Sequence, residues 1–476
     1  MSQEAVRTAA GPAADGLVRG LGLLDATTLI VGSVIGSGIF IAPSIMAGQV
    51  QSPGLLMGLW IVGGLLTLFG ALAYGELAAA MPHAGGQYVF LSRIFGPLPG
   101  FLYGWTLLLA INTGFIAAVA VAFAKYLGVF VPGVSEMTVL FTIGSVKFST
   151  AQAVGLVVIA TLTALNITGL RSGALVQNVF TIAKVAAIAL LVVLAVVLGK
   201  GSTAHFQPLA SVALGPEGVK IGLFAALAVA MSKALFSYDA WNSVTFAAEE
   251  MRDPEKNLVR SLALGSVGVM IVYCSAVAVY LYMVPISEMP GIKDNRIAAE
   301  AAQRMMGGGG VAFIAIAILI STFGCVNGLI LAGARVVYAM ARDRVFFPAM
   351  SAVHPRFRTP ARALVLQGLV AAALTLTGTY SDLLTLSAFS SLLFNTLTVV
   401  GLFVLRSREP DLPRPYRAFG YPVLPALYVA VSCFFLVFIL KGDPKNSGLG
   451  LLLTAAGVPA YLYWRRGASS PSGKEV

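Results

Sequence analysis

Twelve apolar runs, each long enough to cross a lipid bilayer as a helix, follow one another along this chain of 476 residues. Soluble domains average about 25% charged residues, whereas this sequence has 11% charged and 58% hydrophobic residues. The sequence therefore predicts an all-α integral membrane protein with twelve transmembrane helices. The predicted spans are 22–47, 54–80, 97–127, 151–169, 174–199, 220–247, 259–285, 309–340, 361–379, 383–406, 421–440 and 447–464.

The first run is interrupted in its middle by Gly36-Ser37-Gly38. Backbone groups freed from a helix at membrane depth need partners, so such a break is tolerated only against protein or a water-filled cavity. Transporters use breaks of this kind to direct half-helix ends at a substrate. We interpret the tripeptide as an unwound hinge that forms half of a substrate site. The alternative is a face of small residues that packs between helices.

The sixth run has its own interruption, Phe236-Ser237-Tyr238-Asp239-Ala240, about two hundred residues after the first. With five spans in each unit, the second unit enters the membrane from the opposite side, as in an inverted repeat with paired broken helices. We therefore expect a five-plus-five inverted repeat in which helices 1 and 6 are broken, followed by two helices outside the repeat. The expected segments are a cytoplasmic tail (1–20), the transport core (21–406), accessory helices 11 and 12 (407–465) and a second cytoplasmic tail (466–476).

Positive charge is distributed unevenly across the predicted spans. Of the 31 Lys and Arg residues, 19 fall on one side of the spans, 9 on the other and 3 within them. Because Lys and Arg are retained on the cytoplasmic side, we expect both termini in the cytoplasm and a multi-pass protein of the cell's inner (cytoplasmic) membrane. The cations behind the net charge of +11 collect in short loops and do not form one basic face, so no nucleic-acid partner is implied.

Side chains that ligate metals or carry out catalysis are scattered along the chain. Cys274, Cys325 and Cys433 lie in apolar segments, at spacings that suggest neither a metal site nor redox chemistry. The three histidines lie in separate loops, without the paired spacing of a metal site. We therefore expect no metal, no cofactor and no enzyme activity.

Five motifs occur in order along the predicted spans. They are Gly32 to Phe40 in span one, Pro82 to Tyr88 after span two, Phe236 to Asn242 with Glu249-Glu250 in span six, Ser321 to Gly328 in span eight, and Arg408 to Tyr416 after span ten. With this combination the chain resembles the amino acid–polyamine–organocation (APC) superfamily, and most closely bacterial relatives of the L-type amino acid transporters (LAT). The resemblance covers nearly the whole chain. It implies the five-plus-five inverted repeat with two further helices, and movement of amino acids by alternating access.

The resemblance also implies where an amino acid binds. Its carboxylate would meet the amides of Ser37 and Gly38 and the Ser37 hydroxyl, since a helix N-terminus offers unpaired N–H groups and a positive dipole end. Its ammonium would meet the carbonyls of Val34, Phe236 and Asp239. Phe236 matches the aromatic gate that covers the substrate from outside. The other members of the implied site are Ile35, Gly36, Ile39 and Ser237.

Side-chain selectivity is expected to come from the helices that face these breaks. These positions are mostly apolar or small and include no acid, which favours a neutral amino acid. An inward-pointing Phe115 would favour small substrates such as alanine or serine. The alternative for each position is a helix-packing contact only. Matching by register indicates Ile111, Asn112, Phe115 and Val119 in span three, Thr322, Cys325 and Val326 in span eight, and Ser391 in span ten.

Lys184 lies ten residues into span five, roughly 15 Å deep and near the middle of a hydrocarbon core of about 30 Å. Intramembrane charges are costly and usually mark ion or proton pathways. By resemblance, Lys184 matches the lysine whose ammonium replaces the sodium ion of sodium-coupled relatives, and it tethers the first broken helix to span eight. Either it titrates during transport, which would allow coupling to protons, or it is a fixed structural cation.

Other charged residues leave alternatives open. Lys233 either lines an outer vestibule and attracts anionic groups, or reaches into a polar crevice. The Asp239 carboxylate either lies near the substrate or pairs elsewhere. The remaining charged residues of the inner half are expected to form inner-gate or structural ion pairs; they are Glu76, Glu249, Glu250 and Arg335.

The function predicted from these observations is sodium-independent transport of neutral L-amino acids by alternating access, as exchange or as proton-coupled uptake. The alternative is a transporter or antiporter of cationic amino acids or polyamines with the same fold. An amino acid sensor without turnover is a candidate of another class. The expected partners are the amino acid, the lipid bilayer and, in a symporter, protons. Animal family members attach to a glycoprotein through an extracellular cysteine, but no cysteine lies between spans three and four here, so no disulfide-linked subunit is implied.

Overall fold

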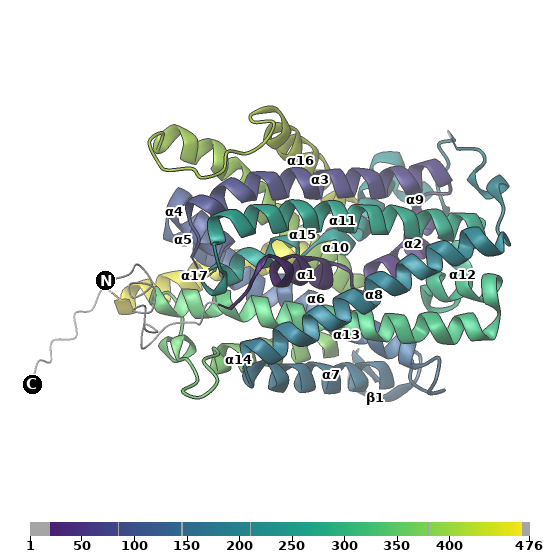
Figure 1. The fold of residues 1–476 in the computed structure, drawn as a ribbon, viewed down its shortest axis with the longest axis horizontal. Helices are drawn as coiled ribbons and strands as arrows, with labels where there is room; N and C mark the ends of the chain where they lie inside the picture. Colours follow the sequence, from purple (N-terminus) through teal and green to yellow (C-terminus); the bar gives the residue numbers. More distant parts are fainter. Residues whose placement is uncertain (1–19, 84, 144–145, 210, 378–379, 469–476) are drawn as a thin grey trace, which may run out of the picture.

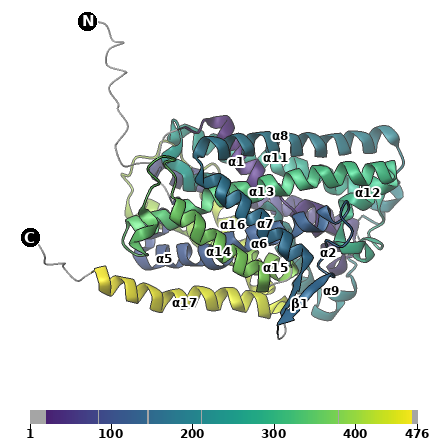
Figure 2. The same cartoon turned by 90° about the horizontal axis from the view of Figure 1, so that it is seen from below.

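Helices make up most of the computed structural model, which describes residues 20–83, 85–143, 146–209, 211–377 and 380–468. Figures 1 and 2 show a bundle of long helices, with shorter helices and loops at its two ends. Among the described residues, ten helices are long and apolar enough to cross a membrane, when the two halves of a broken helix are taken together. The prediction of a helical, multi-pass membrane protein is thereby confirmed.

The elements follow one another as a chain of helices with one hairpin. The first part contains α1 (Leu23–Val34), α2 (Gly38–Gln49), α3 (Pro53–Ala80), α4 (Gln87–Phe95), α5 (Pro97–Thr106), the π-helical segment η1 (Leu107–Ile111), α6 (Asn112–Leu127), strands β1 (Val139–Ile143) and β2 (Val146–Ser149), α7 (Thr150–Ile167) and α8 (Leu170–Leu198). The two strands pair antiparallel. The second part contains η2 (Thr203–Phe206), α9 (Pro216–Ile221), α10 (Leu223–Tyr238), η3 (Trp241–Glu250), α11 (Pro254–Met283), η4 (Met289–Gly291), η5 (Lys293–Asn295), α12 (Ile297–Met306), α13 (Gly308–Arg342), η6 (Pro348–Ser351), α14 (Ala361–Thr377), α15 (Tyr380–Arg408), α16 (Val423–Gly442) and α17 (Pro444–Ala468).

A helix lies at each of the predicted spans, but two of these helices fall outside the set of ten. The apolar part of α14 is the short stretch Ala361–Leu376, and α17 does not belong to the set either. The count of twelve transmembrane helices and the repeat layout therefore stay predictions.

Glycines shift two of the predicted boundaries. The expected link between spans four and five, residues 170–173, is wrong because these residues form the first turn of α8. Thr168 and Gly169 make the turn between α7 and α8, and Gly169 has a φ of +137° that only glycine adopts easily. In the same way Gly222, with a φ of +83°, separates α9 from α10, so the sixth long helix begins at Leu223 and not at residue 220.

The first long helix is interrupted where the sequence predicts. Helix α1 ends at Val34 and α2 begins at Gly38. The Gly36 N–H donates to the Val34 carbonyl (2.8 Å) across Ile35, whose φ of −73° and ψ of 85° form a tight three-residue turn. This turn ends α1 and directs the chain away from the helix axis.

The sixth long helix is also interrupted at the predicted place. Helix α10 ends at Tyr238, Asp239 is extended (φ −69°, ψ 177°), and Ala240 is left-handed with a φ of 69°. Beyond the break the chain continues as η3, a 3-10 helix rather than the expected α-helix. Asn, Ser, Val and Thr in this segment favour the α-helix only weakly, and the Thr245 hydroxyl donates to the backbone carbonyl of Asn242 (2.7 Å).

Other helices cover both interrupted helices. Helix α1 packs against α8, α11 and α13, and α10 packs against α2, α3, α15 and α16. Figure 1 shows α1 in the middle of the bundle, and Figure 2 shows α17 along one edge. The two breaks therefore lie in the interior of the protein, where unwound backbone is protected from lipid.

Candidate substrate site

The two breaks face each other across a small interior cavity. Its walls come from the break between α1 and α2, from α6, from the break after α10, and from α13. The side chains leave room for about one water molecule, so the walls must move apart to admit a larger ligand. The residues that line the cavity are Ser33, Val34, Gly36, Ser37, Gly38, Phe115, Val119, Phe236, Ser237, Asp239, Ala240, Cys325 and Leu329.

Glycine at two positions permits the close approach of the breaks. A Cβ atom on Gly38 would lie 2.1 Å from Ser237 Oγ and 2.8 Å from the Ser237 Cα, and one on Gly36 would lie 2.7 Å from Cys325 Sγ. Real Cβ atoms essentially never come this close to another atom, so any larger side chain would push the helices apart. The small-residue packing that we considered as an alternative is therefore present together with the break.

The N-terminus of α2 supplies hydrogen-bond donors on one side of the cavity. The first N–H groups of a helix have no intrahelical partner, and the helix dipole favours an anion there. Ser37 precedes Gly38 at this end, and its buried side chain does not cap α2. Instead the Ser37 Oγ accepts a hydrogen bond from the Tyr380 hydroxyl (2.9 Å).

Backbone carbonyls supply acceptors at the opposite ends of the breaks. The Val34 carbonyl accepts from the Gly36 N–H (2.8 Å) and from the Tyr273 hydroxyl (2.8 Å). The same hydroxyl lies 2.9 Å from the Ser237 carbonyl, so one phenol of α11 contacts both breaks. The Phe236 carbonyl accepts from the Asp239 N–H (3.2 Å).

Lys184 lies beside the first break, where its three N–H groups are all used. Its ammonium donates to the carbonyls of Gly32 (2.8 Å), Ile35 (2.7 Å) and Ser321 (2.9 Å), and the side chain is 1% exposed. The first two carbonyls belong to the end of α1 and the third to α13. The ammonium thus connects these two elements.

Two aromatic rings, Phe115 and Phe236, border the cavity, and Tyr380 packs behind Phe236. The centroid of the Phe236 ring lies 4.7 Å from that of Phe115 and 6.5 Å from that of Tyr380. Phe236 and Phe115 line the cavity directly. The sequence left the orientation of Phe115 open, and this residue borders the cavity.

Several predicted residues lie in other surroundings. Ile111, Asn112 and Ser391 line an adjacent cavity on the other side of Asp239 and Phe115. The Thr322 hydroxyl turns back to its own helix and donates to the Ile318 carbonyl (2.7 Å). Among the predicted site residues, those that border neither of these two cavities are Ile35, Ile39, Thr322 and Val326.

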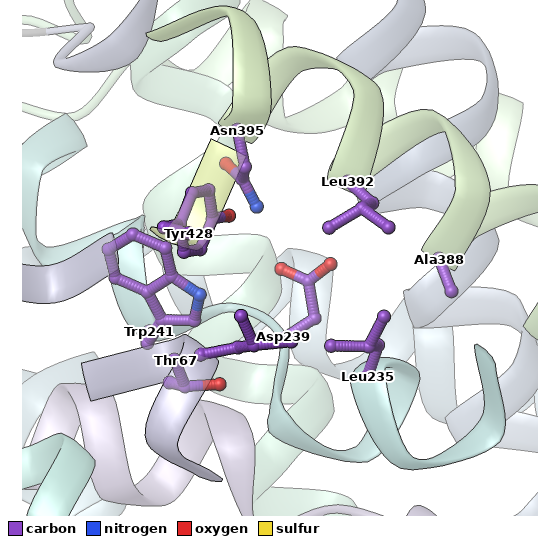
Figure 3. A pocket seen from close by; sticks show the side chains of 9 residues that line it. Thr67, Leu235, Asp239, Trp241, Ala388, Leu392, Asn395 and Tyr428 are labelled. Carbon is purple, nitrogen blue, oxygen red and sulfur yellow. The ribbon is translucent and has the colours of Figure 1, made fainter. Parts of the chain in front are cut away.

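Asp239 lies in the break after α10, and its carboxylate bonds to the backbone of the same break. Its Oδ1 accepts a hydrogen bond from the Ala240 N–H (2.6 Å). Figure 3 shows the carboxylate directed into a further pocket, between Leu235, Leu392 and Asn395. This pocket lies among α3, α10, α15 and α16, and Asp239 thus borders three separate cavities.

Lys233 lies in a polar crevice between α10 and α15. Its ammonium donates to the Thr385 hydroxyl oxygen (2.6 Å), and the side chain is buried. The residue does not border the cavity between the breaks. Of the two interpretations that the sequence left open, the buried crevice agrees with this placement.

The acidic residues Glu76, Glu249 and Glu250 form ion pairs. Glu250 and Arg335 are both 2% exposed and lie 2.8 Å apart, which ties the end of η3 to α13. The Glu250 carbonyl also accepts the N–H groups of Gly20 and Leu21, so the segment before α1 is fixed to the same place. These contacts join the start of α1, the end of η3 and α13 at one end of the bundle.

A second set of ion pairs explains the charged motif after α15. The buried Glu76 pairs with Arg406 (2.5 Å) and Arg414 (3.2 Å). At the surface the guanidinium of Arg93 donates to Glu409 (2.6 Å) and lowers the pKa of that carboxyl. The motif therefore fixes the loop after α15 to α3 and α4. Within the described part of the chain, no three His, Cys, Asp or Glu side chains lie together as a metal site would require.

Sequence reasoning missed two tyrosines at the site, Tyr273 on α11 and Tyr380 at the start of α15. Their partners lie more than two hundred residues away, apart from the Ser237 contact of Tyr273. A tyrosine within an apolar run is a usable signal, because its buried hydroxyl needs a hydrogen-bond partner. The signal does not say which partner it finds.

Comparison with known proteins gives a consistent result. Residues 21–459 match the family described as amino acid permease. The serine/threonine exchanger SteT of Bacillus subtilis (strain 168) is 31% identical, over 96% of this chain and 99% of its own. The large neutral amino acids transporter small subunit 2 of Oryctolagus cuniculus is 32% identical, over 98% and 84%. The human cystine/glutamate transporter is 29% identical, over 94% and 85%.

These relatives are named transporters and exchangers, and the match extends over both interrupted helices and over the ion-paired inner ends. Since a single family accounts for nearly the whole length of the sequence, the chain belongs to the amino acid permease family of the APC superfamily.

Proposed function

We propose that this protein moves neutral L-amino acids across the cytoplasmic membrane by alternating access, through exchange or proton-coupled uptake. The observation that carries the proposal is the pair of breaks that face each other within the bundle, with Gly38 against Ser237. Helix N-terminal amides lie on one side of the cavity and the carbonyl of Val34 on the other. Such a pair suits the carboxylate and the ammonium of one zwitterion.

Transport is proposed to be independent of sodium. The ammonium of Lys184 occupies the place between α1 and α13 and engages three carbonyl oxygens there. Carbonyl oxygens are also the ligands that a small cation takes in broken helices. A covalently attached cation at this place makes a bound sodium ion unnecessary.

A small neutral substrate fits the lining best. Phe115 narrows the cavity, and the neighbouring Val119, Cys325 and Leu329 are apolar or small. The relatives are named for serine and threonine, for large neutral amino acids and for cystine and glutamate, so the family accommodates more than one side chain. One observation favours a second candidate: Asp239 borders three cavities, and a carboxylate near the site suits the distal charge of a cationic amino acid.

We infer the membrane arrangement from the charge distribution. It comprises twelve spans with both termini in the cytoplasm, a core over 21–406 built as a five-plus-five inverted repeat, accessory helices over 407–465, and tails at 1–20 and 466–476. The excess of Lys and Arg on one side supports this orientation. Labelling of single cysteines in the loops from outside intact cells tests it, and a reactive cysteine in the α15–α16 loop would contradict it.

The function is tested with the purified protein in liposomes loaded with each of the twenty amino acids. Stimulated uptake of the same labelled amino acid indicates exchange, and uptake driven by an imposed pH gradient indicates symport. Equal uptake in sodium and potassium buffers is expected. Saturable binding without flux would contradict transport and favour a sensor. Preferential uptake of arginine or lysine would favour the cationic alternative.

A further inference from the structure

Tyr380 lies at the start of α15 and reaches the first break. Its side chain is 3% exposed, and its hydroxyl donates to the Ser37 Oγ at 2.9 Å. Its ring lies edge-on to Phe236, with centroids 6.5 Å apart. Tyr380 thus contacts both the residue assigned to the substrate carboxylate and the residue assigned to the gate, although it does not line the cavity itself.

We propose that Tyr380 is a positioning residue, which directs the proton of the Ser37 hydroxyl toward the substrate carboxylate. This inference rests on the proposed function, because it takes Ser37 as a carboxylate ligand. According to this inference, the contact between α15 and the first break raises the affinity of the site for a carboxylate.

The Ser37 hydroxyl has one proton to donate and two lone pairs that can accept. The bond from Tyr380 uses a lone pair, so the Ser37 proton must point away from the phenol. Ser37 makes no capping bond to α2, and its side chain borders the cavity between the breaks. A hydroxyl that accepts one hydrogen bond also becomes a better donor for the next. The proton is therefore available to a carboxylate at the N-terminus of α2.

The ring of Tyr380 is held in place from a second direction. The ammonium of Lys125 lies 5.0 Å from the ring centroid, where the ring face attracts a cation. Lys125 is itself buried and paired with Glu136, which lies 2.6 Å away in the connection between α6 and β1. A continuous set of contacts therefore runs from this connection through Lys125 and Tyr380 to Ser37.

The test replaces Tyr380 with phenylalanine, which retains the ring and removes the hydroxyl. With L-alanine and L-serine as probes, the KM in liposomes is expected to rise about threefold to tenfold while kcat changes little, the size of one ordinary hydrogen bond. In a Ser37→Ala background the same substitution should have no further effect. Alaninamide lacks the carboxylate. Tyr380→Phe should therefore weaken its competition with the labelled substrate much less than it weakens competition by alanine.

The matched control is Tyr126→Phe. The Tyr126 hydroxyl donates to the Phe40 carbonyl (3.0 Å), so the control removes a buried phenol bond to the same helix α2, away from Ser37. It is expected to lower thermal stability, and its effect on KM should add to that of Ser37→Ala. Lys125→Gln, which removes the cation over the ring, should raise the KM through Ser37 and is a second variant if Tyr380→Phe does not fold.

The outcomes separate this inference from the proposed function. An unchanged KM in Tyr380→Phe, or effects of Tyr380→Phe and Ser37→Ala that simply add, would overturn the positioning role alone. Normal alanine and serine affinity in Ser37→Ala would overturn the Ser37 hydroxyl as a carboxylate ligand, while the proposed transport and the backbone amides of the first break would still stand. A loss of affinity that is equal for alanine and alaninamide would also reject the role, since it would show a general structural effect.

Discussion

Replacing Lys184 with methionine removes three hydrogen bonds at once and keeps most of the side-chain volume. Each bond from a charged donor contributes about 1.5–3 kcal/mol, and desolvation of the buried ammonium offsets several kcal/mol of their sum. A buried carbonyl that is left without a hydrogen-bond partner costs about 1–3 kcal/mol. The carbonyl of Ile35 keeps a bond from the Ser321 hydroxyl (3.0 Å), whereas that of Gly32 loses its bond from the ammonium. The cost therefore falls on the link between α1 and α13.

The expected result for Lys184→Met is a loss of transport in a protein that still folds. A cost of about 3 kcal/mol corresponds to a roughly 100-fold loss in kcat/KM. The bonds from Ser321 to Ile35 and from the Cys325 thiol to the Ser33 carbonyl (2.8 Å) continue to hold α1 against α13. The assay is exchange of labelled amino acid in liposomes, together with thermal unfolding of the purified protein.

The matched control is Lys200→Met, which removes an exposed lysine just beyond the end of the same helix α8. It should transport like the unmodified protein. Transport by Lys184→Met at a normal rate would refute the reasoning, because the tether would then be dispensable. A requirement of the unmodified protein for sodium would refute the substitution of the ammonium for that ion.

Three further substitutions test other parts of the site. Phe236→Ala is expected to abolish uptake in a protein that still elutes as a folded species, because it removes the ring that covers the cavity. Gly38→Ala places a Cβ 2.8 Å from the Ser237 Cα; overpacking of this kind costs about 1–3 kcal/mol, and we expect a roughly 5- to 100-fold lower kcat/KM in the exchange assay. Arg335→Met leaves Glu250 buried without its guanidinium, at a cost of about 3–5 kcal/mol, and should lower the midpoint of thermal unfolding.

Each of these has a control in the same chain. Phe236→Tyr keeps the ring and should retain uptake, and normal uptake by Phe236→Ala would remove the gate assignment. Gly58→Ala adds a Cβ that meets no atom within 4 Å, so it should be neutral; equal losses at both glycines would contradict the close-approach argument. Combining Arg335→Met with Glu250→Gln should recover much of the stability, because the buried charge is removed together with its partner.

The sequence predicted the features that arise from local chemistry. Glycine and serine in the middle of an apolar run predicted the break at Gly36, and the family resemblance, not the depth of Lys184 alone, implied that this lysine tethers α1 to α13. The 3-10 geometry of η3 was not predicted, because the apolar pattern indicates the length of a helix but not whether it is an α-helix or a 3-10 helix. The turn at Gly169 was missed for a similar reason: polar residues after it imitate a loop although they begin a helix.

Contacts between distant parts of the chain could not be predicted from one sequence. The bond from Tyr380 to Ser37 joins residues 343 positions apart, and that from Tyr273 to Val34 joins residues 239 positions apart. Register errors of one helical turn also matter, because Thr322 and Cys325 lie on the same helix and only Cys325 borders the cavity. Which residues of a helix border the cavity depends on how all the helices pack together, and one sequence does not give that packing.

The Val34 carbonyl is the point at which substrate binding and helix movement meet. Its two lone pairs are already used by the Gly36 N–H and the Tyr273 hydroxyl, and that hydroxyl also contacts the Ser237 carbonyl of the second break. A substrate ammonium that binds the Val34 carbonyl must therefore take the place of one of these donors. If the Gly36 N–H is displaced, the turn that ends α1 opens. If the Tyr273 hydroxyl is displaced, it keeps only its contact with the Ser237 carbonyl of the second break. In either case the occupied site differs from the empty one in how α1 is joined to its surroundings, which is the difference in contacts that a conformational change driven by substrate requires.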